Sequence, residues 1–288
     1  MGVGRVGRPV GNPTVRLRRL AGELARRRSA AGFSREEVAQ RLGLAGSTVY
    51  RIETGHTRPQ SRTMRDLLDL YQVEGSEREA ILELAREAGR RGWWHAYGDV
   101  LPGPYVGLEA EAASVRNYEP LLLPGLLETE AYARAVVGAA LVEDPKEIDR
   151  RIAVRMARQR RLTGPGAIEL WVVLDEAALR RPVGGPHVMA EQLRRLQDVA
   201  AQPNVTIQVL PFDAGAYLGM GSPLAILSFA DPEDSDVVFL ENMGSELYLE
   251  DSDQVRRYAT VFDHLRAAAL SPEKSIEKII SVEKELTG

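Results

Sequence analysis

The chain has 288 residues, no cysteine and a formal net charge of −4, so it is long enough for two domains of ordinary size and contains no disulfide bond. No apolar stretch approaches the roughly 20 residues that cross a bilayer, and the first residues contain no apolar segment typical of a signal peptide. We therefore expect a cytoplasmic protein without a membrane-spanning segment.

The overall charge hides an asymmetry along the chain. Residues 1–72 contain 14 arginines and 6 acidic residues, a net charge of +8, whereas the other 216 residues contain 23 basic and 35 acidic residues, a net charge of −12. The first part attracts phosphate groups and the second repels them. A charged run is usually only a solvated surface, so the asymmetry gains meaning from the motif that lies within the basic part.

The first 30 residues predict a leader and a helix. Residues 1–13 contain four glycines and two prolines without apolar periodicity, which predicts a disordered leader. Arg5 and Arg8 could contact a minor groove, although an unstructured tail is the simpler interpretation. A helix is predicted over residues 14–30, with these apolar residues on one face: Val15, Leu17, Leu20, Leu24 and Ala25.

Residues 35–54 have the pattern of a helix-turn-helix. Gly43 stands where the chain must leave the first helix in a left-handed conformation, which glycine adopts at little cost. Ser34 and Glu37 predict a capping box, and Gly55, which follows the second helix, is predicted to be its C-cap. Several apolar residues recur at spacings that pack two short helices against one core: Val38, Leu42, Leu44, Val49 and Ile52. An ordinary helical hairpin is the alternative.

Two further helices complete the predicted DNA-binding domain. One covers residues 62–72, with Met64, Leu67, Leu68 and Tyr71 facing inward. Ser76 and Glu79 predict the cap of the other, which runs to about Arg91. Because the composition changes between residues 80 and 105, we expect a DNA-binding domain over 14–91 and an effector domain over 92–288.

The effector domain is predicted to combine helices with a sheet. Residues 121–127 are apolar with a Pro-Gly break, a helix passes through Tyr132, and Asp144 caps a helix that runs to about Leu162. Further helices are predicted at 107–118, 187–201, 252–269 and 272–285, and strands at 168–174, 205–210, 224–229, 236–241 and 246–250. The predicted fold is thus an all-α domain followed by an α+β domain with a mixed sheet.

The second helix of a helix-turn-helix enters the major groove, so residues 45–53 are predicted to contact bases. The outward positions that we expect to contact base edges are Gly46, Ser47, Tyr50 and Arg51. Arg51 can form a bidentate pair with guanine, and Ser47 can donate or accept a hydrogen bond. Tyr50 contacts either a thymine methyl or a phosphate, with packing at the domain surface as the alternative.

Other polar residues of the motif have predicted supporting roles. The residues predicted to contact phosphates are Arg35, Thr48, Arg58 and Arg62. For Arg62, and for Arg41 nearby, a solvated charge is the simpler alternative. Glu53 carries a charge that DNA repels, so we interpret it as a scaffold residue that forms an ion pair with Arg28 of the first helix.

The motif resembles a known class of regulator. Residues 33–59, FSREEVAQRLGLAGSTVYRIETGHTRP, resemble the phage-repressor or XRE type of helix-turn-helix. The resemblance implies a five-helix, lambda-repressor-like fold. Such domains usually have Gln where this chain has Arg35, and often Ser or Gln where it has Gly46, which has no side chain to make the base contact expected there.

Most of the remaining chain carries a second resemblance. The segments LLLPGLLETEAYARA (121–135), LWVVLDEAALRRPVGG (170–185) and VVFLENMGSELYLED (237–251) resemble the antitoxin-like effector domain of an actinobacterial family that includes streptomycete developmental regulators. The resemblance implies transcription control, with a small co-encoded protein as a frequent partner, and no established ligand. The 33 arginines and 4 lysines agree with a GC-rich bacterial genome.

The effector domain has no pattern of residues typical of catalysis, so we expect no enzyme activity, metal or cofactor. There is no cysteine, and the four histidines are far apart in the sequence. Asp175 and Glu176 follow a predicted strand and are interpreted as the cap of the next helix. A group of aromatic and arginine residues could line a pocket for a small molecule or peptide, with core packing as the alternative: Trp94, Arg116, Arg155, Arg158, Trp171, Phe212 and Tyr217.

Taken together, these patterns predict a homodimeric transcriptional regulator that binds double-stranded DNA at a palindromic operator. A small protein or ligand would act through the effector domain, where the Gly-rich segment 211–221 is a candidate lid or contact surface. The alternative is an antitoxin-like protein that sequesters a small co-encoded partner and regulates its own operon. The sequence specifies neither the operator nor whether the protein activates or represses.

Overall fold

A computed structural model describes residues 15–89, 104–140, 144–232, 234–242 and 245–287. The chain divides into two compact units, Met1–Leu108 and Glu109–Gly288, and each is described by itself. The predicted leader and the predicted boundary between residues 91 and 92 lie outside the described residues.

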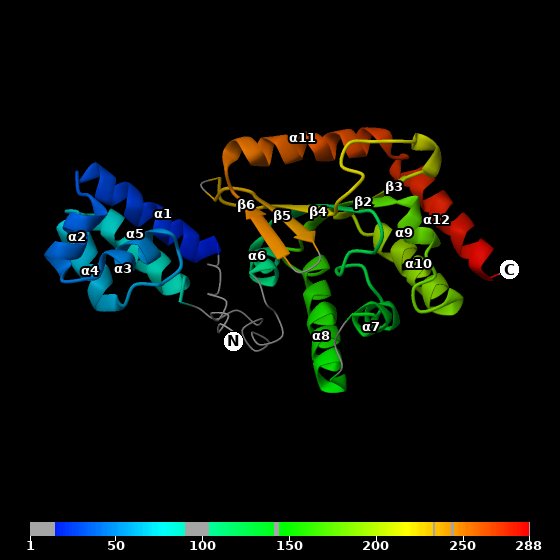
Figure 1. Ribbon diagram of the computed structural model, residues 1–288, viewed down its shortest axis with the longest axis horizontal. Coiled ribbons are helices and arrows are strands. Elements are labelled where there is room, and N and C mark those ends of the chain that lie inside the picture. Colours follow the sequence, from blue (N-terminus) through cyan, green and yellow to red (C-terminus); the bar gives the residue numbers. More distant parts are fainter. Residues whose placement is uncertain (1–14, 90–103, 141–143, 233, 243–244, 288) are drawn as a thin grey trace, which may run out of the picture. The chain divides into compact units, whose positions relative to one another are not determined.

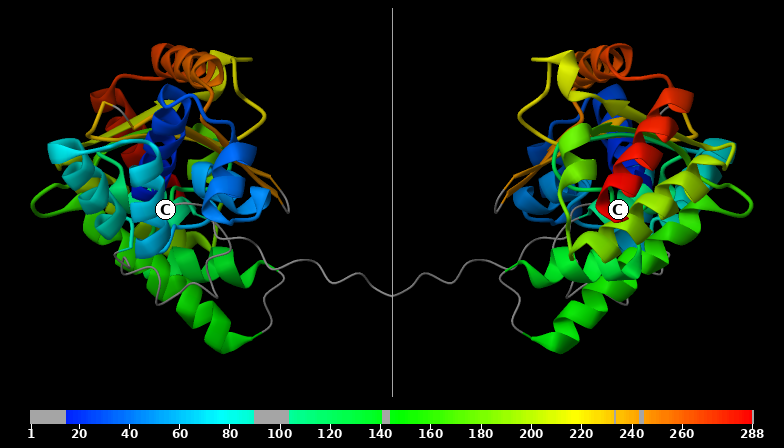
Figure 2. Two further views of the ribbon diagram at one scale, coloured as in Figure 1. Left: turned by 90° about the vertical axis from the view of Figure 1, so that its left-hand side faces the viewer. Right: turned by 90° about the vertical axis from the view of Figure 1, so that its right-hand side faces the viewer.

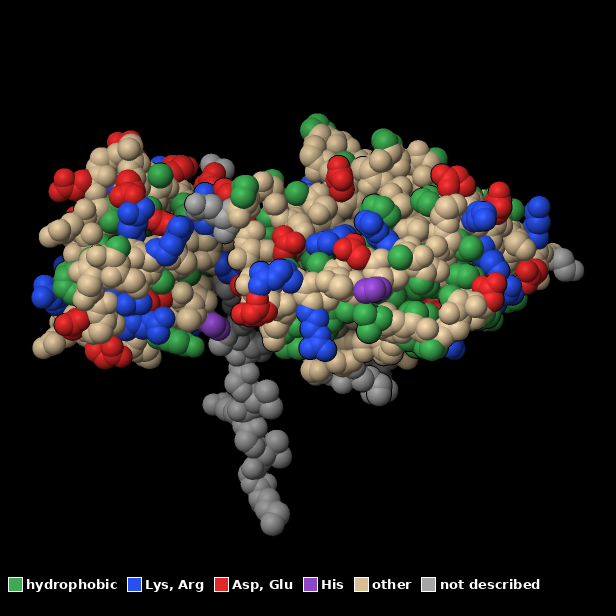
Figure 3. Space-filling model, turned by 90° about the horizontal axis from the view of Figure 1, so that it is seen from above, with side chains coloured by type: hydrophobic (Ala, Val, Ile, Leu, Met, Phe, Trp, Pro, Cys, Tyr) green, Lys and Arg blue, Asp and Glu red, His purple; other side chains and the backbone are tan. Residues whose placement is uncertain are grey.

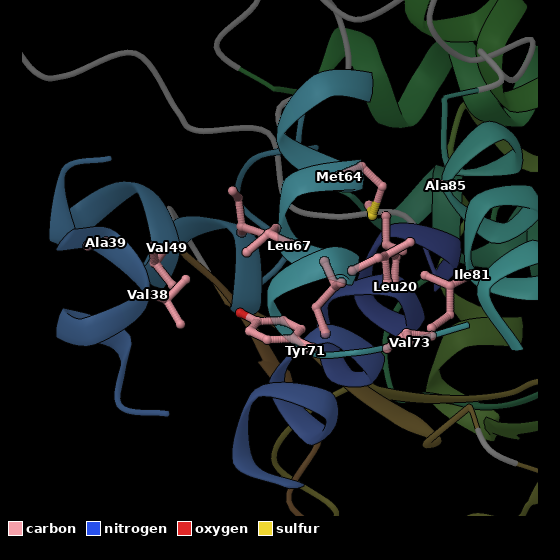
Figure 4. Close-up of a cluster of buried hydrophobic side chains, with 13 residues drawn as sticks. Leu20, Val38, Ala39, Val49, Met64, Leu67, Tyr71, Val73, Ile81 and Ala85 are labelled. Carbon is pink, nitrogen blue, oxygen red and sulfur yellow. The ribbon is translucent and has the colours of Figure 1, made fainter. Parts of the chain in front are cut away.

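Unit 1 is built from helices, as predicted. They are α1 (Val15–Ala30), α2 (Arg35–Leu42), α3 (Gly46–Glu53), α4 (Ser61–Leu70) and α5 (Gly75–Glu87), shown in Figure 1. Their apolar faces meet in one core, drawn in Figure 4, which contains Leu20 and Val38 together with Val49 and Leu67. The predicted spacing of apolar residues therefore identifies the core of this unit.

The start and end of α2 follow the predicted local chemistry. Ser34 Oγ accepts from the Glu37 amide at 3.2 Å, and a Glu37 carboxylate oxygen accepts from the Ser34 amide at 2.7 Å. This is the predicted capping box. Gly43 ends α2 in a left-handed conformation with φ of 63°. After α3, Thr54 caps the helix and Gly55 follows with φ of 72°.

The prediction for the start of α5 is wrong. The helix begins at Gly75 with Glu74 as the cap residue, so Ser76 lies inside the first turn and no side chain caps the helix. Val73 is buried in the core and its carbonyl accepts a hydrogen bond from Arg78 at 3.2 Å. These contacts fix the chain just before Gly75, which outweighs the local preference of Ser76 for the cap position.

Unit 2 contains a mixed sheet, as predicted. Its strands are β1 (Ser114–Glu119), β2 (Glu169–Asp175), β3 (Val205–Leu210), β4 (Leu224–Ser228), β5 (Val237–Asn242) and β6 (Ser245–Leu249). They are ordered β3-β2-β1-β4-β5-β6. β1 pairs in parallel with β2, and β2 with β3, whereas the β1–β4, β4–β5 and β5–β6 pairs are antiparallel.

Helices cover both faces of this sheet. They are α7 (Glu130–Gly138), α8 (Pro145–Arg158), α9 (Glu176–Arg180), α10 (Pro186–Ala200), α11 (Ser252–Ala268) and α12 (Pro272–Thr287), with short 3-10 turns η2 (Gln159–Leu162) and η3 (Phe212–Ala214). α11 lies along one face, and α7, α8 and α10 lie on the other (Figures 1 and 2). The start of α12 covers the outer edge of β3, where Ser275 Oγ accepts from the Val209 amide at 2.9 Å.

The predicted helix over residues 107–118 is only partly correct. Helix α6 (Tyr105–Glu111) ends early, and the next residues form β1. The alanines at 110, 112 and 113 favour a helix locally, but Val115 and Tyr118 are buried, and β1 pairs with both β2 and β4. Tertiary pairing therefore decides the structure of this segment. From residue 168 onward, the predicted strands and helices are present within two residues of their expected ends.

Candidate nucleic-acid interface and effector domain

One side of α3 is exposed to solvent, and the opposite side is part of the core. Val49 and Ile52 are buried. The exposed residues of α3, which we call the recognition surface, are Gly46, Ser47, Tyr50 and Arg51. The side chain of Tyr50 is 52 % exposed although it is large and aromatic. The four residues predicted to contact bases thus lie on the side of α3 that is open to a ligand.

Arg51 is the recognition-surface residue with the greatest capacity for specific hydrogen bonds. Its side chain is exposed and makes no hydrogen bond or ion pair within the part of the chain that the structure describes. A guanidinium in this condition can direct two parallel N–H groups at the N7 and O6 atoms of guanine.

Glu53 lies at the buried end of α3 and binds two arginines. Its side chain is only 1 % exposed, and its two oxygens accept from Arg28 Nε and from Arg35 Nε, each at 2.7 Å. Arg28 also donates to the Phe33 carbonyl at 2.7 Å. The Glu53 carboxylate raises the pKa of Arg28 because it stabilises the charged guanidinium. Glu53 therefore joins α1, α2 and α3.

Two contacts of Arg35 are absent from the sequence-based interpretation. Arg35 binds Glu53, and its guanidinium carbon lies 5.5 Å from the centre of the Tyr50 ring, within the range of a cation–π contact. The spacing of Tyr50 and Glu53, three residues apart on α3, would have indicated that they share a side of the helix. The sequence does not show that Arg35 lies on the same side of α3, because its position depends on the angle at which α2 crosses α3.

The other residues predicted to contact phosphates differ in their exposure and in their partners. Arg62 is 92 % exposed, and its ion-pair partner Asp66 lies 4.0 Å away. Arg58 is exposed, but its guanidinium lies against Gly89, where a Cβ atom would be 2.0 Å from Nη1. Thr48 is partly buried. Arg62 is therefore the freest of the three to meet a phosphate.

In unit 2, the structure does not bring the predicted pocket residues together at one site. Trp94 lies outside the described residues. Arg155 and Arg158 both lie beside Gly125. Arg155 Nη1 donates to both oxygens of Glu128 at 2.8 Å, and Arg158 forms a two-pronged pair with Glu109 at 2.8 and 2.7 Å.

Both of those carboxylates are only 1 % exposed, so the two arginines fix the Pro-Gly segment through buried ion pairs. Two other predicted pocket residues contribute to the sheet. Arg116 pairs with Asp236 at 3.5 Å. Trp171 donates to Gln208 at 2.9 Å, and the Arg266 guanidinium lies 4.2 Å from the centre of its ring. These side chains already have partners within unit 2, which leaves less of their polar surface for a ligand.

The Gly-rich segment 211–221 is anchored near its start and at its middle but exposes apolar side chains. The Phe212 amide donates to Glu176 at 3.1 Å. The Tyr217 hydroxyl donates to Asp175 and lies 2.7 Å from the Tyr118 hydroxyl, and burial raises the pKa of Tyr217.

Three large apolar residues of this segment remain exposed, namely Phe212 at 58 %, Leu218 at 55 % and Met220 at 55 %. The segment lies against α11, because a Cβ atom at Gly219 would be 3.1 Å from Val261. Figure 3 views the molecule from the side of α11 and shows apolar side chains exposed among the charged ones.

The adjacent carboxyl groups at the end of β2 have structural partners. Asp175 caps α9 by accepting from the Ala177 amide at 2.7 Å. Glu176 accepts from Arg180 at 2.6 Å, and Arg180 helps to lower the pKa of Glu176 against the opposing effect of burial. No group of three or more potential ligating side chains suited to a metal occurs among the described residues.

Comparisons with known proteins identify both parts of the chain. Residues 19–81 match a family described as a helix-turn-helix domain. Residues 103–281, more than half of the chain, match a family described as a domain of unknown function, DUF5753. No curated protein and no solved structure matches significantly. None of the described helices combines the length and apolarity that a membrane crossing requires.

Proposed function

The chain belongs to the family defined by the domain of unknown function DUF5753 and carries a helix-turn-helix domain; from this premise we propose that it is a sequence-specific, homodimeric transcriptional regulator of the XRE type. The observation that carries the proposal is the recognition surface of α3, on which Arg51 is exposed and has no partner among the described residues. Because the target is chromosomal DNA, we place the protein in the cytoplasm of its bacterial host.

Specificity in this proposal comes from a few side chains of α3. Arg51 pairs with guanine, and Ser47 makes an additional polar contact. Gly46 makes no side-chain contact, and its lack of a side chain lets the backbone of α3 come close to the DNA. Arg35, Thr48, Arg58 and Arg62 contact phosphates and set the position of α3 in the groove. Arg62 has the strongest support among them, since its side chain is almost fully exposed.

Dimerisation follows from the affinity that regulators need. A single helix-turn-helix makes few base contacts, and a two-fold dimer doubles them on a palindromic site. We assign the dimer contacts to the effector domain, because the size of unit 2 leaves room for an interface apart from the DNA. The effector domain binds and does not catalyse; the partners of Asp175 and Glu176 support this assignment.

We assign control of the regulator to a protein partner that contacts segment 211–221. Its exposed Phe212, Leu218 and Met220 support a protein contact, since apolar side chains of this size are often exposed at interaction sites. The anchors at Tyr217 and at the Phe212 amide support a preformed surface. A small-molecule effector has less support. Arg116 and Trp171 are neighbours on β1 and β2, and Trp171 and Tyr217 pack against one cluster, but their polar groups have partners and Arg155 and Arg158 lie apart from them beside Gly125.

The same segment favours a second candidate function, an antitoxin-like protein whose main task is to sequester a small co-encoded protein. Purification from the native host separates the two candidates. A small protein that remains stoichiometric at every salt concentration favours sequestration. Release of the small protein, together with retained DNA binding, favours regulation.

Genomic footprinting of the full chain tests the proposed function. We expect protection of a small set of palindromic sites, and altered occupancy when a co-encoded partner is added. Binding spread evenly over the genome would contradict sequence-specific regulation. Unchanged occupancy with the partner would contradict control through the effector domain.

A further inference from the structure

The guanidinium of Arg35 lies between a buried carboxylate and an exposed aromatic ring. On one side, Arg35 Nε donates to Glu53 at 2.7 Å; on the other, its guanidinium carbon is 5.5 Å from the centre of the Tyr50 ring. The Arg35 side chain is 40 % exposed, so it is also within reach of solvent and ligands. Glu53, Arg35 and Tyr50 thus form one contiguous group, which we call the Arg35 cluster and which includes Tyr50 of the recognition surface.

The Arg35 cluster has more contacts than an arginine needs in order to bind a phosphate. The Glu53 carboxylate is fixed on its other side by Arg28, which is in turn bound to the Phe33 carbonyl. The hydrogen bond to this carboxylate holds Arg35 at Nε, and the Tyr50 ring lies beside the planar guanidinium. The ring of Tyr50 therefore has a neighbour whose position is set by Glu53.

We propose that Glu53, acting through Arg35, holds the ring of Tyr50 in place to contact the methyl group of a thymine in the major groove. This inference rests on the proposed function, since it assumes that α3 enters the groove. The thymine methyl is the apolar group that the major groove presents, and an aromatic ring that is half exposed can cover it. The Tyr50 hydroxyl makes no hydrogen bond with any described residue, so the ring is the part of this side chain that Arg35 orients.

The three residues of the Arg35 cluster have distinct roles. Tyr50 touches the base, whereas Arg35 and Glu53 are positioning residues that act through it. The Arg35 Nη groups make no hydrogen bond to another described residue, so Arg35 can contact a phosphate at the same time. Loss of Arg35 should therefore change which sequence is preferred, in addition to lowering affinity for every sequence.

The test replaces single thymines of the footprinted operator with deoxyuridine. This change removes one methyl group and leaves base pairing intact. We expect the wild-type protein to lose about threefold to fivefold in affinity at one position of each half-site, the value of one buried methyl group. Competition binding of the two duplexes measures the ratio directly.

Variants then assign this ratio to residues. Tyr50→Ala should abolish it, and Tyr50→Phe, which keeps the ring, should retain it. Arg35→Lys keeps the positive charge but has no planar group to lie over the ring, so it should reduce the ratio while preserving most of the affinity. Arg62→Gln is the matched control, because Arg62 is exposed and makes no contact with Glu53, Arg35 or Tyr50. It should weaken binding to both duplexes equally.

Glu53→Gln should also reduce the ratio, because an amide cannot accept two charged donors as a carboxylate does. If this variant fails to fold, Arg35→Lys carries the test, since it leaves the Glu53 pair with Arg28 intact. A mere loss of stability lowers affinity for both duplexes and leaves their ratio unchanged, so the ratio separates positioning from scaffolding.

A ratio of one at every thymine, or a ratio that Tyr50→Ala leaves unchanged, would overturn the methyl contact. An unchanged ratio in Arg35→Lys would overturn the positioning role. If the wild-type protein has no sequence preference at all, the proposed function itself fails. This failure of the proposed function is distinguishable from failure of the methyl contact, because it is seen with the wild-type protein alone.

Discussion

Buried carboxylates determine where several arginines of this protein lie. Glu53 joins the helices of unit 1, while Glu109 and Glu128 hold Arg158 and Arg155 in unit 2. Breaking a buried pair by removing one partner costs about 3–5 kcal/mol because the remaining charge stays out of water. Arginines in such pairs serve the fold first, which leaves exposed ones such as Arg51 to bind a ligand.

The carboxyl group of Glu119, at the end of β1, predicts a pH-dependent stability. Burial raises its pKa to about 7, with further contributions from Glu241 and Glu128. A carboxyl with a raised pKa in the folded state binds its proton more tightly there than in the unfolded chain. Its contribution to stability is therefore complete below its ordinary pKa of 4.5 and is lost as the pH rises to about 7.

We expect Glu119→Gln to lessen the loss of stability between pH 5 and pH 8. Urea-dependent hydrogen exchange of peptides from β1–β3 measures this loss, because Glu119 lies at the end of β1 in unit 2. Glu169→Gln, at the exposed start of β2, is the control and should behave like the wild type. Equal pH dependence in wild type and Glu119→Gln would show that Glu119 does not titrate in this window.

The exposed residues of α3 could be predicted from the sequence, because helical periodicity alone separates Ser47 and Arg51 from the buried Val49. The contacts of Arg35 could not, since they depend on the crossing of α2 and α3. Nor could the structural partners of the arginine and aromatic residues predicted to line a pocket in unit 2. The same aromatic and arginine residues can line a cavity or pack in a core. Only the contacts of each side chain in the structure distinguish a cavity lining from a core.

At the scale of elements, the turn between α2 and α3 depends on backbone conformation more than on space. Gly43 has φ of 63°, yet a Cβ atom there would meet nothing within 4 Å. Gly43→Ala should therefore destabilise unit 1 by about 1–2 kcal/mol through left-handed strain alone.

Gly22→Ala should have the opposite sign. Gly22 lies within α1 and is also open on all sides, so alanine there should stabilise the helix by up to about 1 kcal/mol. Urea-dependent hydrogen exchange of peptides from α1–α5 measures both variants. Destabilisation of similar size in the two would point to a steric cost that the structure does not contain.

Segment 211–221 is the element whose mobility should depend on a single hydroxyl. Tyr217→Phe removes the hydrogen bonds to Asp175 and Tyr118, each contributing about 1 kcal/mol. Hydrogen exchange in 211–221 should then become about tenfold faster or more. Tyr258→Phe, on α11 in the same apolar cluster, is the matched control and should leave exchange unchanged. Equal exchange in both variants would mean that the Tyr217 hydroxyl does not hold the segment.

Elements with one dominant local signal, such as α2 with its capping box and left-handed glycine, could be predicted nearly to the residue. β1 could not. Its alanine-rich approach favours a helix, and its strand conformation comes from two neighbours that lie more than 50 and 100 residues later in the chain, β2 and β4. Such long-range pairing leaves little trace in a short window of sequence.

At the scale of the whole molecule, the charge asymmetry predicts a strong salt dependence of DNA binding. A dimer that makes about 6–10 phosphate contacts should lose about a thousandfold or more in affinity between about 50 mM and about 200 mM salt. Fluorescence anisotropy with a labelled operator measures the slope. Arg62→Gln should reduce the slope by about one unit for each phosphate that the variant no longer neutralises. A flat response would exclude phosphate neutralisation as the source of affinity.

The central claim is that Arg51 on α3 selects the DNA sequence, and its most direct test compares wild type with Arg51→Ala. The quantity to measure is the ratio of affinities for the footprinted operator and for an unrelated duplex at one salt concentration. We predict that Arg51→Ala lowers this ratio by about tenfold or more, the value of a bidentate arginine–guanine pair at each half-site, while affinity for the unrelated duplex is nearly unchanged. A ratio equal to that of the wild type would contradict the claim.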